Sequence, residues 1–93
     1  MKLSQIELVA ERVAKRELGN DWVDHVDARL DFDADGDRIW RILVILTDPT
    51  KVAATKLAGF VRNLRAELDP ADPYPIVSFR SVSDNRDLTP EPA

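Results

Sequence analysis

The densest group of residues that could do chemistry is the acidic stretch Asp-Phe-Asp-Ala-Asp-Gly-Asp at 31–37. Oxygen ligands at alternate positions followed by a glycine resemble the opening of an EF-hand calcium loop. The glutamate that closes such a loop is replaced by Ile42, and the flanking residues alternate as strands do. A hairpin turn is therefore the favoured interpretation. The weak candidates for a divalent-cation site or for carboxylate-based catalysis are Asp31, Asp33, Asp35 and Asp37.

The other residues with catalytic potential form no recognisable motif. His25 is the one histidine, Asp24 precedes it, and serines occur at 78, 81 and 83, but there is no Gly-x-Ser-x-Gly elbow. The three glycines are too few and too scattered for either common phosphate-binding loop. We therefore expect neither an enzyme nor a bound cofactor.

The charge of the chain argues against nucleic acid as a partner. The formal net charge is −4, and the basic residues are dispersed along the sequence. Binding to phosphates depends mainly on clustered lysine and arginine, so this composition disfavours it. An RNA-binding or ribosome-associated protein remains an alternative, and it would bind through Arg62, Arg65 and Arg80.

Length and composition indicate one folded domain. The chain has 93 residues, of which 44% are hydrophobic and 32% charged, as is ordinary for a globular protein. There is no cysteine, no signal-peptide pattern and no apolar run of membrane-spanning length. We expect a cytoplasmic protein with a domain over 1–84 and a disordered tail over 85–93.

The spacing of apolar residues predicts two helices. Ser4 and Glu7 match a capping box, and the apolar residues that follow recur at helical spacing as far as Gly19. Asp48-Pro49 predicts the start of a second helix, which the proline-rich segment 69–73 ends.

Three segments read as strands. Residues 26–34 alternate between apolar and charged, 38–46 become continuously apolar, and 75–82 follow the second helix. A three-residue turn at 35–37 would place Phe32 opposite Trp40. The connection from 46 to 75 is long enough for a right-handed crossover, so the last two strands should be parallel.

The predicted fold is therefore α+β: a small two-layer α-β-β-α-β domain. Its three-stranded mixed sheet combines a β-hairpin with a βαβ crossover, and both helices cover one face. The other face would carry Ile39, Leu43 and Ile45 among charged residues. We interpret these three as an apolar interface for a partner protein or for a second copy of the chain.

The order of elements resembles the N-terminal domain of the ribosome maturation factor RimP, over residues 6–88. The resemblance runs from Trp22-Val23 through 41–45 to Leu68-Asp69-Pro70-Ala71-Asp72-Pro73. Segment 81–88 lacks the proline and glycine of the family's serine-proline-glycine motif, so the resemblance implies a fold and no functional residues. In size and layout the chain is also similar to the neutralising partners of bacterial toxin–antitoxin pairs.

Overall fold

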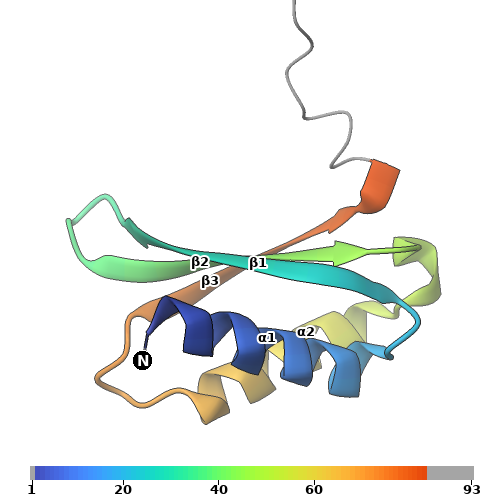
Figure 1. The fold of residues 1–93 in the computed structure, drawn as a ribbon, viewed down its shortest axis with the longest axis horizontal. Helices are drawn as coiled ribbons and strands as arrows, with labels where there is room; N and C mark the ends of the chain where they lie inside the picture. The colour runs from blue at the N-terminus through green and yellow to red at the C-terminus, as the bar shows by residue number, and fades with distance from the viewer. Residues whose placement is uncertain (1, 84–93) are drawn as a thin grey trace, which may run out of the picture.

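A computed structural model describes residues 2–83, which form two helices packed against one face of a three-stranded sheet (Figure 1). The predicted α-β-β-α-β order and the mixed sheet are confirmed. The prediction of a disordered tail falls outside the described residues. The elements are α1 (Leu3–Leu18), β1 (Val23–Phe32), β2 (Arg38–Leu46), the 3-10 helix η1 (Pro49–Lys51), α2 (Ala54–Glu67) and β3 (Tyr74–Ser81).

Helix α1 begins earlier than the capping box predicted. Ser4 lies inside the first turn, and the cap is Lys2, whose backbone N–H donates to the side-chain carbonyl of Gln5 at 2.8 Å. The helix ends at Gly19, as predicted, with φ +102°. A Cβ at this position would lie 2.9 Å from Cδ1 of Trp22, so both backbone and packing require glycine.

The hairpin turn lies one residue earlier than predicted. The backbone N–H of Asp33 donates to the carbonyl of Asp37 at 2.9 Å, so the turn occupies 34–36 and not 35–37. Gly36 stands at the third turn position with φ +83°. A three-residue loop places a left-handed residue there, and glycine adopts that conformation without strain. The position of the glycine therefore determines where the chain turns.

The shifted turn changes which residues face one another. Leu30, and not Phe32, lies opposite Trp40. Side chains alternate with a period of two along a strand, so a register shift of two leaves every side chain on its predicted face. The shift does change the charged neighbours, because it brings Arg29 directly opposite Arg41.

The predicted second helix is divided in two. Asp48 caps only η1, by accepting from the backbone N–H of Thr50 at 3.0 Å. Val52 then adopts an extended conformation and is buried, and α2 starts at Ala54. The helix that the sequence pattern predicted as continuous is therefore interrupted at Val52.

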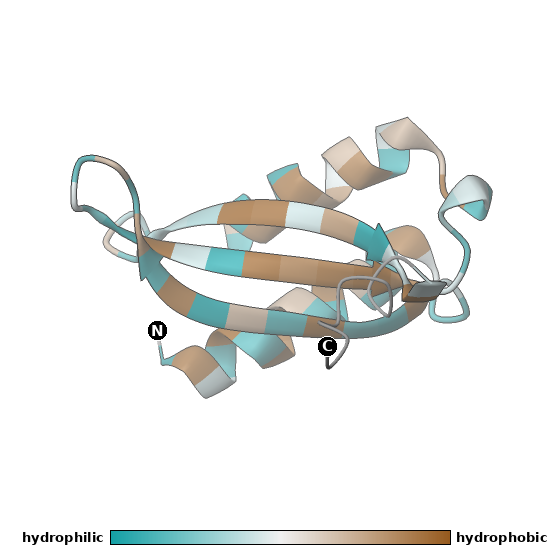
Figure 2. Ribbon diagram, turned by 90° about the horizontal axis from the view of Figure 1, so that it is seen from above, coloured by the Kyte–Doolittle hydropathy of each residue, from teal (hydrophilic) through white to brown (hydrophobic). Residues whose placement is uncertain are grey.

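Strand β2 lies between antiparallel β1 and parallel β3. Its central position explains its apolar character, which Figure 2 shows beside the more alternating β1. The core lies between the sheet and the helices, where Phe60 and Phe79 pack edge to face with ring centroids 5.9 Å apart. No helix within residues 2–83 is long and apolar enough to cross a membrane.

Candidate functional site

No helix of the described chain covers the second face of the sheet, which we call the open face (Figure 1). The register places alternate residues of each strand on it. The open face consists of His25, Asp27, Arg29 and Asp31 from β1, Ile39, Arg41, Leu43 and Ile45 from β2, and Tyr74, Ile76, Ser78 and Arg80 from β3. The middle of this face forms a shallow depression of about 590 Å³.

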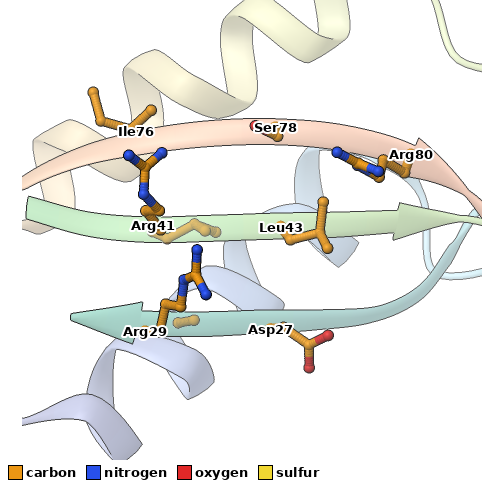
Figure 3. Close-up of a pocket in the computed structure, with 9 residues that line it drawn as sticks. Asp27, Arg29, Arg41, Leu43, Ile76, Ser78 and Arg80 are labelled. Carbon is orange, nitrogen blue, oxygen red and sulfur yellow. The ribbon is translucent and has the colours of Figure 1, made fainter. Parts of the chain in front are cut away.

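Three arginines reach into the depression, one from each strand (Figure 3). Arg29 and Arg41 are direct cross-strand neighbours. Like charges in that arrangement destabilise a sheet. Arg80 comes from β3, and no carboxylate of residues 2–83 forms an ion pair with it. The open face thus gathers positive charge although the chain as a whole is acidic.

Asp31 is the carboxylate that the two paired arginines share. Its Oδ2 accepts from Nε of Arg41 at 2.5 Å and lies 3.8 Å from Nη2 of Arg29. A hydrogen bond from the backbone N–H of Phe32, together with the Arg41 guanidinium, lowers the pKa of Asp31 below its usual value. One ionised carboxylate therefore serves two cations, and Arg29 remains 74% exposed.

Apolar side chains lie between the arginines. Leu43 is partly buried in the middle of the open face, and Ile76, which is level with Arg41, is 40% exposed. The expectation that Ile39 and Ile45 are exposed is wrong, since their exposed fractions are 4% and 0%. Both belong to the central strand, which has a neighbouring strand on each side. Of the three predicted interface residues, only Leu43 offers surface in the described structure.

His25 stands at one end of β1, between two carboxylates. Its Nδ1 lies 2.6 Å from Oδ2 of Asp24, and its Nε2 lies 3.4 Å from Oδ2 of Asp27. The hydrogen bond with Asp24, and secondarily the charge of Asp27, raise the pKa of His25 above 6.5. The hydrogen bond found for the ring is to Asp24, so the contacts described for His25 show no nucleophile–base pair.

The acidic hairpin is organised as a turn. Oδ1 of Asp33 accepts from the backbone N–H groups of Asp35 and Asp37, each at 2.9 Å. The carboxylate of Asp31 accepts a hydrogen bond from Nε of Arg41. Within residues 2–83 no three acidic, histidine or cysteine side chains come together as a metal site would require. The turn interpretation therefore accounts for the geometry of these aspartates.

The basic residues named for the RNA alternative do not share a surface. Arg62 and Arg65 are on α2, on the helical side of the sheet, whereas Arg80 is on the open face (Figures 1 and 3). The guanidinium of Arg65 lies 4.5 Å from the centroid of the Tyr74 ring. The arginines that do lie together are Arg29, Arg41 and Arg80, one from each strand. Strand alternation in the sequence predicted that Arg29 and Arg41 lie on the same face.

Comparisons with protein-family models, with curated proteins and with solved structures found no significant match to this chain. The resemblance to the RimP N-terminal domain accordingly stays a prediction, and the argument for function depends on the geometry of the open face.

Proposed function

We propose that this protein is a non-enzymatic interaction module that binds another protein through the open face. The observation that carries the proposal is the combination of apolar and cationic groups on the one sheet face that no described helix covers. Apolar surface surrounded by charge is typical of protein-binding sites, and arginine is enriched among the residues that dominate binding energy. We expect the protein to act in the cytoplasm, since it has no cysteine.

The charge of the open face favours a different protein over a second copy. Three arginines and two aspartates give the face a net positive formal charge. Stacking two copies through this face would bring surfaces of the same sign together, which opposes association. A partner with a negative surface meets no such penalty.

A peptide-display selection tests this proposal and does not require the partner to be identified first. The full chain is immobilised, and bound peptides are counter-selected against Leu43→Glu, which changes the centre of the open face. We expect peptides that bind the unchanged chain and not the variant. Peptides that bind both equally would contradict the proposal, because their site would lie elsewhere.

Light scattering over a concentration series tests whether the open face binds a different protein or a second copy of the chain. We expect a monomer at all concentrations. A dimer that Leu43→Glu dissociates would instead assign the open face to self-association.

A further inference from the structure

We propose that the open face accepts an acidic amphipathic helix, with an apolar side chain of the helix on Leu43 and carboxylates on the arginines at either side. This inference rests on the proposed function and specifies the chemistry of the partner. It follows from the charge of the face, from the spacing of its arginines and from the width of the sheet.

Charge gives the first argument. Arg29 and Arg41 oppose each other with one shared carboxylate, and Arg80 has no ion-pair partner within residues 2–83. A guanidinium binds a carboxylate through two parallel hydrogen bonds, which gives both strength and orientation. An incoming carboxylate would also relieve the repulsion between the two opposed arginines.

Spacing gives the second argument. Arg41 is level with Ile76 in the register, and Arg80 is four residues further along β3. At about 3.3 Å per residue these arginines are separated by about 13 Å along the strands, with Leu43 between them. Two turns of a helix rise about 11 Å, so acidic residues two turns apart match the arginines and an apolar residue one turn from each matches Leu43.

The width of the sheet gives the third argument. Three strands span two gaps of about 4.8 Å, or about 10 Å. One helix with its side chains is about 10 Å across, so a single helix covers the face from edge to edge. The resulting three-layer arrangement, with helices on both faces of the sheet, is a common solution to sheet burial.

The same observations disfavour nucleic acid. Leu43 and Ile76 line the depression, and an apolar floor offers nothing to phosphate groups. The aromatic rings on the open face of the described chain are those of Tyr74, which already stacks with Arg65, and His25, which is hydrogen-bonded to Asp24. A base would need a free aromatic surface to stack on.

The test uses a fluorescein-labelled, capped, alanine-rich helical peptide with Glu, Leu and Glu one turn apart on one face. A control peptide of the same composition places the leucine on the opposite face. Anisotropy titrations with the full chain should show binding of the first peptide and at least about tenfold weaker binding of the control. Equal affinity for the two peptides would overturn the inference.

Two charge-neutralising variants locate the contact. Arg80→Gln should weaken binding of the acidic peptide by about tenfold, whereas Arg62→Gln, which removes the same charge from α2, should change it by less than about twofold. Arg80 makes no ion pair in residues 2–83, so its replacement should leave folding intact. Equal losses in the two variants would overturn the inference, because they would indicate attraction to overall charge.

A labelled single-stranded RNA provides the competing outcome. Tight RNA binding that Arg80→Gln abolishes, without binding of the acidic peptide, would assign the face to nucleic acid and overturn both proposals. If display instead selects neutral or basic peptides that Leu43→Glu excludes, the interaction module stands and only the acidic helix is refuted.

Discussion

Two adjacent residues of β2 test the assignment of the faces. Ile42 points into the core and is 2% exposed, whereas Leu43 points to the open face and is partly buried. Replacing each in turn by glutamate introduces the same charge at neighbouring positions of one strand. The face that each side chain occupies then determines the cost.

The losses in free energy of unfolding expected for the two substitutions differ severalfold. Burial of an aliphatic side chain contributes about 1.5–3 kcal/mol, and Ile42→Glu loses all of it. It also places a carboxylate without a partner in the core, which costs several kcal/mol more. The sum approaches the whole stability of a small domain, about 5–15 kcal/mol, so this variant should be unfolded.

Leu43→Glu should stay folded. Leu43 keeps only a minor part of its surface in water, so its replacement forfeits most of the burial energy of a leucine, about 1–2.5 kcal/mol. The new carboxylate lies directly opposite Asp27, which repels it, and near Arg29 and Arg41 on the same face, which attract it, so these exposed charge interactions largely offset one another. The net loss of stability should therefore be about 1–2.5 kcal/mol, well below that of Ile42→Glu.

Urea unfolding followed by tryptophan fluorescence and circular dichroism measures both variants. Leu43→Gln is the matched control, because it has the same shape as glutamate without the charge. It should differ from Leu43→Glu by less than about 1 kcal/mol, because the arginines and Asp27 act on the glutamate in opposite directions, and the difference should shrink as salt screens these charges. If Leu43→Glu loses as much stability as Ile42→Glu, the open face is covered in the folded protein and the reasoning is refuted.

Three further predictions concern stability. Gly19→Ala should cost at least about 1–2 kcal/mol in urea unfolding, because alanine is strained at φ +102° and its Cβ meets Trp22; an unchanged midpoint would contradict this. Asp33→Ala should cost about 1–2 kcal/mol through loss of two turn hydrogen bonds, whereas Asp35→Ala, with no side-chain hydrogen bond among those found in the turn, should cost less. The raised pKa of His25 means that protonation stabilises the folded state below pH 6.5 and that this contribution is lost as pH rises through the folded pKa. The stability deficit of His25→Asn should therefore be larger at about pH 6 than at about pH 8.5, and a deficit that does not change with pH would contradict the role of the two flanking carboxylates.

The sequence predicts the order of elements because each has a strong local signal. The alternation of β1, the continuous apolar run of β2 and the proline-rich stop after α2 all depend on neighbouring residues, so they are visible in the sequence alone. The errors occur where two local signals compete. Two registers keep the apolar residues of the hairpin on one face, and the one observed places Gly36 at a position of positive φ; the helical pattern is interrupted at Val52, which is extended and buried.

The candidate site is harder to predict because it depends on contacts between distant segments. Alternation alone placed Leu43 and Arg41 on the open face. Alternation determines the face on which a side chain lies and not its exposure, so Ile39 and Ile45 were wrongly expected at the surface. The pairing of Arg29 with Arg41 depends on the turn position, and the approach of Arg80 depends on the crossover that sets β3 beside β2.

The central claim is that the open face is the surface that binds. Amide chemical shifts of the full chain, isotopically labelled and titrated with the acidic helical peptide, test it most directly. The account predicts that the largest changes fall at Arg41, Leu43 and Ile76, in the middle of the face. Changes confined to α1 and α2, on the opposite side of the sheet, would contradict it.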